Sequence, residues 1–132
     1  MSKKKNKKIV KQVYQYFKEG QLDKLYGLLA DDIVWILPKM PKVPFSGKCQ
    51  GIEQVTQFFE ILAETQDSIE FNPIEFIAQK DYVVALGRFN WQVKSTGKSY
   101  ESDWAQVFKL RNGRITRFQE FADTSLVVAA FS

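Results

Sequence analysis

Two polar residues in the last third of the chain have the setting that proton-transfer chemistry requires. Gln106 and Glu120 lie in two segments rich in aromatic residues, 99–110 and 114–122. Both segments alternate as β-strands do, which places Glu120 on the same face as Phe118. A carboxyl group among aromatic side chains loses hydration, so its pKa rises towards neutrality and it can accept or return a proton. We therefore predict Glu120 as a general acid or base.

Gln106 shares its strand face with Trp104 and Phe108 by the same alternation. A glutamine amide donates and accepts hydrogen bonds, but it does not transfer protons near neutral pH. We predict that Gln106 orients a ligand. The alternative is a polar core residue that is bonded to a neighbouring strand or to a buried water.

The roles of Glu120 and Arg88 depend on strand register. Glu120 is instead a structural residue if it forms an ion pair with Arg88 or Arg117. Arg88 binds an anionic group of a ligand if it points inward, whereas it meets Asp103 if it points outward. A one-residue change in the turn at 111–114 exchanges the two faces of the strand that carries Glu120. Both interpretations stay open, and Arg88 is included among the predicted ligand-binding residues.

The chain lacks the residues on which several common chemistries depend. It has no histidine and one cysteine, Cys49, so neither a Ser-His-Asp arrangement nor a zinc site is expected. No glycine-rich phosphate-binding motif occurs in the sequence. We therefore predict no metal and no cofactor, and a chemistry that depends on carboxylates, Tyr, Lys or Arg, or on the reactivity of the ligand itself.

Length and composition are those of one folded domain. The 132 residues are 45% hydrophobic and 14% aromatic, which is enough for a core without disulfides, and we assign 1–132 to a single domain. No apolar run reaches the roughly 20 residues of a membrane span, so no membrane partner is expected. A single cysteine suits a reducing compartment, and we predict a cytoplasmic protein.

The net charge of +4 is concentrated at the start of the chain. Five lysines lie within residues 1–8, and the remaining residues include 14 basic and 15 acidic side chains. We interpret 1–8 as a solvated, frayed helix start, although a basic tail can also contact phosphates or anionic lipid. No basic stripe interleaved with aromatic residues follows, so nucleic-acid binding is not predicted.

Apolar spacing changes along the chain from helical to β-like. It predicts helices around 9–17, 22–29 and 52–62, a strand at 33–37, and a proline-rich loop at 38–44. It then predicts four successive strands at 68–79, 82–94, 99–110 and 114–122, and a short final helix at 126–131. Asn112-Gly113 between the last two strands is a strong hairpin signal. Helices followed by an antiparallel meander indicate the α+β class.

Two segments resemble a known family. ADDIVW at 30–35 and YESDWAQVFKLRNGRITRFQEFADTS at 100–125 are similar to the SnoaL-like branch of the nuclear transport factor 2 and ketosteroid isomerase superfamily. The resemblance implies a cone-shaped, cystatin-like fold, in which a strongly curved antiparallel sheet wraps over three helices. It also implies one deep apolar pocket. Enzymes, binding proteins and transport adaptors all share this fold, so the resemblance alone does not fix the activity.

The matching positions lack the catalytic groups of the ketosteroid isomerases. Val13 stands where those enzymes have a tyrosine, Leu37 where they have a base aspartate, and Gln106 where they have a protonated aspartate. Tyr14 is one residue away, which is about 100° around a helix, so we do not predict that it substitutes. SnoaL-like proteins often have Trp-x-His-x-Phe in the fourth strand, and here Gln106 replaces the histidine.

By the resemblance, the face that carries Gln106 and Glu120 lines the cavity. The predicted pocket holds a mostly apolar small molecule, is closed by the 38–44 loop and the third helix, and is lined by Trp35, Trp104, Gln106, Phe108, Phe118 and Glu120. The predicted function is that of an isomerase, cyclase or hydratase that uses Glu120; the alternative is a non-catalytic ligand-binding or protein-interaction module. Because the strands carry apolar residues on both faces, we also predict a homodimer packed through the outer sheet face.

Overall fold

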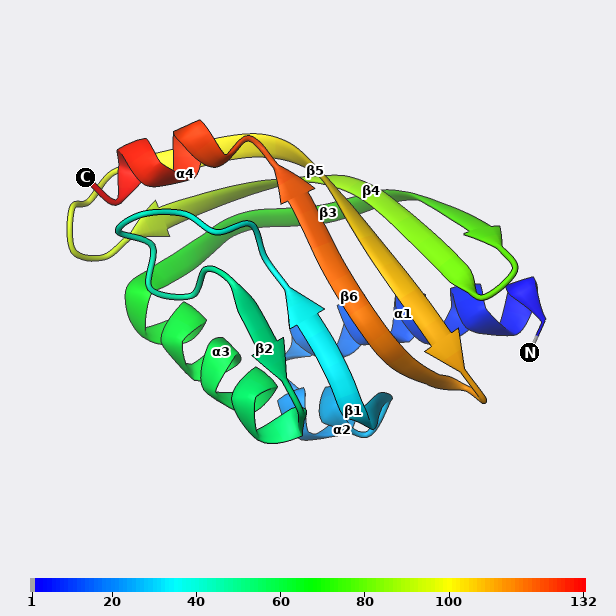
Figure 1. Ribbon diagram of the computed structural model, residues 1–132. Helices are drawn as coiled ribbons and strands as arrows, with labels where there is room; N and C mark the ends of the chain where they lie inside the picture. The colour runs from blue at the N-terminus through cyan, green and yellow to red at the C-terminus, as the bar shows by residue number, and fades with distance from the viewer. Residues whose placement is uncertain (1) are drawn as a thin grey trace.

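A computed structural model of the chain describes residues 2–132. Within this range, six strands form one curved, unclosed sheet that is accompanied by four helices (Figure 1). The helices are α1 (Lys3–Glu19), α2 (Leu22–Tyr26), α3 (Ile52–Thr65) and α4 (Thr124–Ala130). The strands are β1 (Leu29–Ile36), β2 (Lys48–Gln50), β3 (Gln66–Gln79), β4 (Tyr82–Val93), β5 (Ser99–Arg111) and β6 (Arg114–Ala122). Their order in the sheet is β2-β1-β6-β5-β4-β3, which confirms the predicted α+β class.

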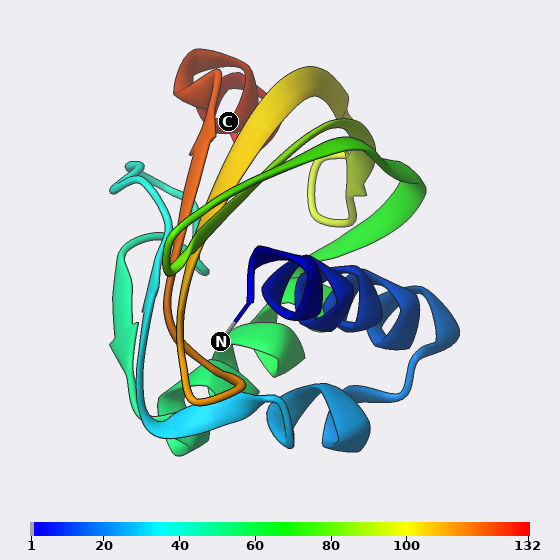
Figure 2. The same cartoon turned by 90° about the vertical axis from the view of Figure 1, so that its right-hand side faces the viewer.

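The sheet curves around helices α1 and α3 (Figure 2). α1 begins at the N-cap Ser2, whose hydroxyl oxygen accepts a hydrogen bond from the Lys5 N–H at 3.1 Å. It ends at Gly20, which adopts a left-handed conformation with a φ of 71°. α1 packs against β3 and β4, and α3 packs against β1, β2 and β3. The concave sheet face and these two helices therefore enclose the interior.

Several details differ from the sequence prediction. The first helix begins at Lys3, earlier than the predicted residue 9, and so includes the lysine-rich segment. α2 ends at Tyr26 instead of continuing to residue 29, because the Leu28 carbonyl accepts a hydrogen bond from the Ile115 N–H at 2.9 Å and the chain joins the sheet. β1 pairs with β6 in parallel, whereas the other strand pairs are antiparallel as predicted. The sequence pattern does not predict β2, because three residues are too few to show alternation.

The predicted hairpin between β5 and β6 is confirmed, and it contains a bulge. Asn112 has a φ of 52°, as a tight Asn-Gly turn requires. The pairing then shifts by one residue. Leu110 pairs with Ile115 but Lys109 pairs with Arg117, so Thr116 has no partner in β5. Beyond the bulge Gln106 lies directly opposite Glu120. Because one residue exchanges the faces of a strand, this bulge places the Glu120 side chain inside.

β4 shows the clean alternation of a strand with one face in the core. Its buried residues occur at every second position and are Val83, Ala85, Gly87, Phe89, Trp91 and Val93. The residues between them are exposed or half-buried. β5 alternates in the same way, and its register with β4 is continuous. The two strands therefore supply a long inner wall in which inward and outward side chains alternate regularly.

Candidate functional site

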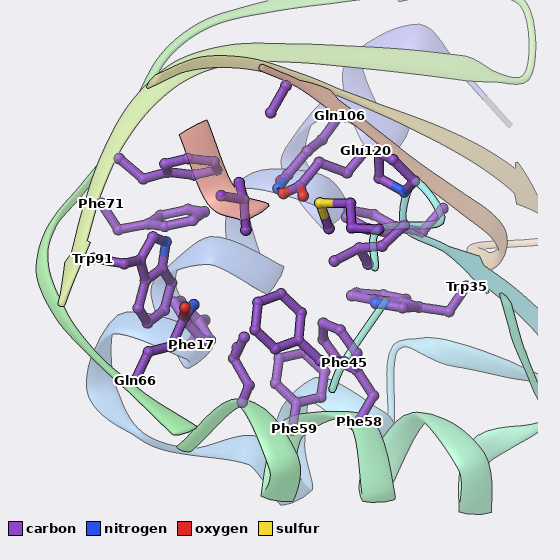
Figure 3. A pocket seen from close by; sticks show the side chains of 18 of the residues that line it. Phe17, Trp35, Phe45, Phe58, Phe59, Gln66, Phe71, Trp91, Gln106 and Glu120 are labelled. Atoms are coloured by element: carbon purple, nitrogen blue, oxygen red, sulfur yellow. Dashed lines mark hydrogen bonds between the residues drawn. The ribbon is translucent and has the colours of Figure 1, made fainter. Parts of the chain in front are cut away.

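A cavity lies between the concave face of the sheet, α1, α3 and the loop that follows β1 (Figure 3). Its volume is about 70 Å³. On the same measure a buried water needs roughly 10–15 Å³, so the cavity has room for several waters or a small organic group. Half of its lining residues are aromatic, with Phe17, Trp35, Phe45, Phe58, Phe59, Phe71, Phe89, Trp91, Phe108 and Phe118 among the lining side chains. The polar groups in this lining are few.

A chain of three hydrogen-bonded side chains forms the main polar part of the cavity wall. The Tyr14 O–H donates to Gln106 Oε1 at 2.6 Å, and Gln106 Nε2 donates to Glu120 Oε1 at 2.8 Å. The three residues come from α1, β5 and β6, so helix packing and strand pairing together create the arrangement. In Figure 3 the Gln106 and Glu120 side chains lie side by side at the cavity.

Glu120 has the electrostatic setting of a proton carrier. Burial disfavours its charged form and raises the pKa of the carboxyl to about 7, and the Gln106 hydrogen bond opposes this by only a smaller amount. None of the salt bridges within residues 2–132 includes Glu120, so the predicted alternative of an ion pair with Arg88 or Arg117 is wrong. The carboxyl is therefore restrained by one neutral amide and faces an aromatic cavity.

Tyr14 is the site residue that the sequence reasoning excluded. Its side chain lines the cavity, and burial followed by the nearby Glu120 charge holds its pKa well above the ordinary value. The phenol therefore stays protonated and acts as a hydrogen-bond donor. A sequence signal existed, because Val10, Val13, Tyr14 and Phe17 have the i, i+3, i+4, i+7 spacing of one helix face. The sequence prediction took Val13 as the inward-facing position and excluded Tyr14, which is the next residue along the helix.

A second polar pair also lines the cavity, and neither member is predicted from sequence. The Tyr100 O–H donates to Gln66 Oε1 at 2.7 Å, and both side chains are buried. Burial is the main cause that raises the Tyr100 pKa far above its ordinary range. Strand alternation indicates that Tyr100 points inward, but nothing in the sequence pairs it with a residue at the start of β3.

Most of the predicted lining residues reach the cavity. Trp35, Gln106, Phe108, Phe118 and Glu120 all line it, as do residues of α3 and of the proline-rich loop that we expected to close it. The ring of Trp35 stacks on that of Phe118, with centroids 3.8 Å apart and an interplanar angle of 16°. These residues form the wall next to Glu120.

Trp104 is inside the protein but does not line the cavity. Its indole is 3% exposed and stacks against Tyr14 and Phe71, with centroids 5.8 Å and 5.2 Å away. Gly87 lies opposite on β4, and a Cβ there would meet the Trp104 ring. The predicted face of Trp104 is therefore correct, but its predicted role in lining the pocket is wrong, because other aromatic rings lie between it and the space.

Arg88 lies on the outer face of the sheet, which corrects the prediction that it contacts a ligand. Its guanidinium donates to Asp103 at 2.8 Å and to Glu101 at 3.3 Å, and its side chain is 48% exposed. The register of β4 explains this position, because Arg88 falls between the inward-facing residues 87 and 89 and pairs with Asp103. No anionic group of a ligand in the cavity can be assigned to it.

Residues 2–132 contain no group of three or more His, Cys, Asp or Glu side chains positioned to share a metal ion. In the same range, no helix has both the length and the apolar character needed to cross a membrane.

The chain was compared with known proteins and structures. Residues 10–118 match the model of the SnoaL-like domain. A solved NTF2-like protein from Burkholderia xenovorans LB400 has 29% identity and a TM-score of 0.92, over 100% of this chain and 99% of that one. An NTF2-like protein from Burkholderia thailandensis E264 has 26% identity and a TM-score of 0.88, over 100% and 99% of the two chains. TerC, co-crystallised with polyporic acid, has 21% identity and a TM-score of 0.83, over 96% and 98%. No curated protein matches the sequence at a significant level.

The curved six-stranded sheet and its helices define a protein with the NTF2-like fold. Because the domain match spans residues 10–118, which is most of the chain, the protein belongs to the SnoaL-like family. This confirms the family that the two sequence segments indicated.

Proposed function

We propose that this protein binds a mostly apolar small molecule in the aromatic-lined cavity and that Glu120 transfers a proton of that molecule. The observation that carries the proposal is the setting of the Glu120 carboxyl. It faces the cavity, is held by Gln106 Nε2 at 2.8 Å, and has no salt bridge within residues 2–132. With a pKa of about 7, both its acid and its carboxylate form are populated near neutral pH.

The three hydrogen-bonded residues have separate roles in this proposal. As a carboxylate, Glu120 removes a proton from a carbon next to a carbonyl group of the ligand, and as an acid it returns that proton at a second position. The ligand then keeps its atoms, which corresponds to an isomerisation. In a cyclisation the carbanion instead bonds to a second carbonyl carbon of the ligand, whose oxygen takes the proton from Glu120. In a hydration Glu120 takes a proton from a water that adds to a carbon–carbon double bond, and returns it to the neighbouring carbon. Gln106 orients the carboxyl group. Tyr14 donates to Gln106 Oε1, which leaves Nε2 of that amide to face Glu120.

A non-catalytic ligand-binding module is the second candidate function. The observation that favours it is that Glu120 is the only group of the Tyr14–Gln106–Glu120 chain that titrates near neutral pH. A proton-transfer enzyme often uses a separate acid and base, and this wall supplies one carboxyl group. TerC, which has the same fold, was co-crystallised with an organic molecule, polyporic acid.

A general carbon-acid substrate can test proton transfer before the natural ligand is identified. We choose 5-nitrobenzisoxazole, whose ring opens when a base removes its carbon-bound proton and the N–O bond breaks, giving a coloured phenolate. We expect acceleration by the wild-type protein to rise with pH through a midpoint near 7, as Glu120 ionises. Glu120→Gln keeps the shape and an acceptor for Gln106, and we expect it to lower the rate about 100-fold or more.

The matched control is Glu101→Gln, which changes an exposed carboxylate on the outer face of β5. This variant should retain the wild-type rate and pH profile. Loss of thermal stability in Glu120→Gln with an unchanged rate would contradict the catalytic role and support a structural one. Equal rates together with equal binding of an apolar probe would favour the non-catalytic module.

We further propose that two copies of the chain pack through the outer face of the sheet. An apolar stripe crosses four strands there, and strand pairing makes it continuous. We call it the outer stripe, and it consists of Ile77, Val84, Leu86, Ala105, Val107 and Phe121. Its end residues Ile77 and Phe121 are 49% and 51% exposed, whereas the other four are half-buried. A contiguous apolar surface of this kind is typical of a protein interface.

A further inference from the structure

Gln66 and Tyr100 lie on a different wall of the cavity from Glu120. Gln66 is the first residue of β3 and is 3% exposed, although its side chain lines the cavity. Figure 3 shows the Gln66 amide across the cavity from Gln106 and Glu120, among Phe17, Phe71 and Trp91. The mechanism proposed for Glu120 does not use this pair. Its place in an aromatic wall therefore needs a separate explanation.

The Gln66 amide has an unused hydrogen-bond donor. Its Oε1 accepts from Tyr100, but its Nε2 donates no hydrogen bond within residues 2–132. Nε2 also does not belong to the fully occluded polar atoms without a partner, which include the indole nitrogens of Trp35 and Trp104. The donor is thus reachable while nearly all of the residue is buried. A buried donor without a partner is costly, so a site of this kind favours a ligand that supplies an acceptor.

We propose that Gln66 and Tyr100 form a second polar subsite, which binds a hydrogen-bond-accepting oxygen of the ligand at the end remote from Glu120. The inference rests on the proposed ligand-binding function and narrows its ligand class. The ligand is an apolar molecule with oxygen groups at both ends, one at Glu120 and one at Gln66 Nε2. Tyr100 is a positioning residue, because its O–H holds Gln66 Oε1 and so turns Nε2 towards the ligand.

The two subsites lie in the same small cavity. The Glu120 charge lies near enough to contribute to the raised pKa of Tyr100. Aromatic side chains line the space between them, and the cavity volume of about 70 Å³ is small. An aromatic wall contributes affinity for the apolar surface of a ligand, but it does little to fix the orientation of that ligand. Two separated polar contacts do fix the orientation. The second subsite therefore decides which carbon of the ligand is presented to Glu120.

Binding of matched hydroxynaphthalenes by isothermal titration calorimetry tests this subsite. The mono-oxygenated probes are 1-naphthol and 2-naphthol, and the doubly oxygenated probes are 1,5-, 2,6- and 2,7-naphthalenediol, which space their hydroxyl groups differently. We expect the wild-type protein to bind at least one diol about fivefold to tenfold more tightly than either naphthol, the usual contribution of one added hydrogen bond. A symmetric diol can bind in two equivalent orientations, which by itself raises its apparent affinity. The measured preference for the diol must exceed this statistical effect.

The decisive variant is the double substitution Gln66→Leu with Tyr100→Phe. Replacing both partners avoids leaving one of them buried and unpaired, so the fold and the affinity for naphthol should be retained. We expect the double variant to lose the diol preference, while Gln92→Leu, the same change at an exposed position of β4, keeps it. A diol preference that survives in the double variant would overturn the second subsite.

The outcomes separate this inference from the proposed function. Naphthols that bind the wild-type protein without any diol preference would overturn the second subsite and leave the Glu120 proposal standing. A wild-type protein that binds neither these five probes nor the one-ring phenols resorcinol and hydroquinone would overturn small-molecule binding by the cavity, and the second subsite with it. Melting temperatures of all variants show whether a lost preference reflects an unfolded protein. Tyr100→Phe alone, which frees the Gln66 amide to rotate, is the second variant and should also lose the diol preference.

Discussion

Among single residues, Glu120 connects the chemistry of the site to the stability of the fold. Burial raises its pKa from an ordinary value of 4.5 to about 7, so the folded protein holds this proton more tightly than the unfolded chain does. Its stability contribution is thus most favourable below pH 4.5 and declines as the pH rises to about 7. Above that range both states are ionised and the contribution is constant.

We therefore predict that ionisation of Glu120 destabilises the wild-type protein between pH 5 and pH 8, by about 1–3 kcal/mol. Glu120→Gln cannot ionise at this position and should lack that part of the pH dependence. The measurement is the free energy of unfolding by urea for both proteins at several pH values. Parallel curves for the two proteins across this range would show that the Glu120 pKa is not raised by folding.

Tyr14 provides a second test at the scale of one residue. Tyr14→Phe keeps the ring that packs against Trp104 but leaves Gln106 Oε1 without its donor at 2.6 Å. The amide can then rotate, and we expect proton transfer from 5-nitrobenzisoxazole to slow about fivefold to tenfold, as for the loss of one buried hydrogen bond. Tyr16→Phe makes the same change elsewhere on α1 and should have no such effect. An unchanged rate in Tyr14→Phe would show that Glu120 does not need the chain of hydrogen bonds.

At the scale of elements, the sequence predicts side-chain directions well where a regular period runs unbroken. The alternation in β5 correctly predicts that Gln106 and Phe108 face inward, because β5 pairs continuously with β4. In β4 the sequence leaves the direction of Arg88 open, because it does not fix the register of the hairpin. The Asn112-Gly113 turn is likewise predicted, since both residues tolerate positive φ. The curved α+β fold follows from the resemblance of two segments to the SnoaL-like family, which the domain match confirms.

The same reasoning fails where one residue changes the phase of an element. Thr116 adds a residue to β6 and exchanges its faces, yet a bulge leaves no mark in composition. The inward direction of Glu120 is therefore predicted by the family resemblance and not by the residue pattern. Tyr14 was excluded because one residue in a helix is about 100°, and the packing of α1 decides that angle. Gln66 in β3 and Tyr100 in β5 are 34 residues apart in sequence, so only the folded protein brings the two side chains together. Site residues are harder to predict than the fold because they depend on such local shifts.

At the scale of the whole molecule, the two faces of the sheet have different surroundings. The inner face and the helices enclose the cavity, whereas the outer stripe leaves apolar side chains in contact with water. Strand pairing makes the stripe continuous from β3 to β6, at the outer side of the same strands that carry Gln106 and Glu120. Association through this stripe would bury it without covering the cavity wall on the opposite face.

We therefore predict that the protein sediments as a dimer at micromolar concentration and that Phe121→Glu shifts it to a monomer. Phe121 is 51% exposed, so a charge there should cost little within one chain but should be strongly unfavourable inside an apolar interface. Leu126→Glu changes another exposed apolar residue, on α4 and outside the stripe, and should leave the dimer intact. Sedimentation velocity distinguishes the two states, and melting temperatures show that each variant is folded. A monomeric wild-type protein, or a dimer that is unaffected by Phe121→Glu, would exclude association through the outer stripe.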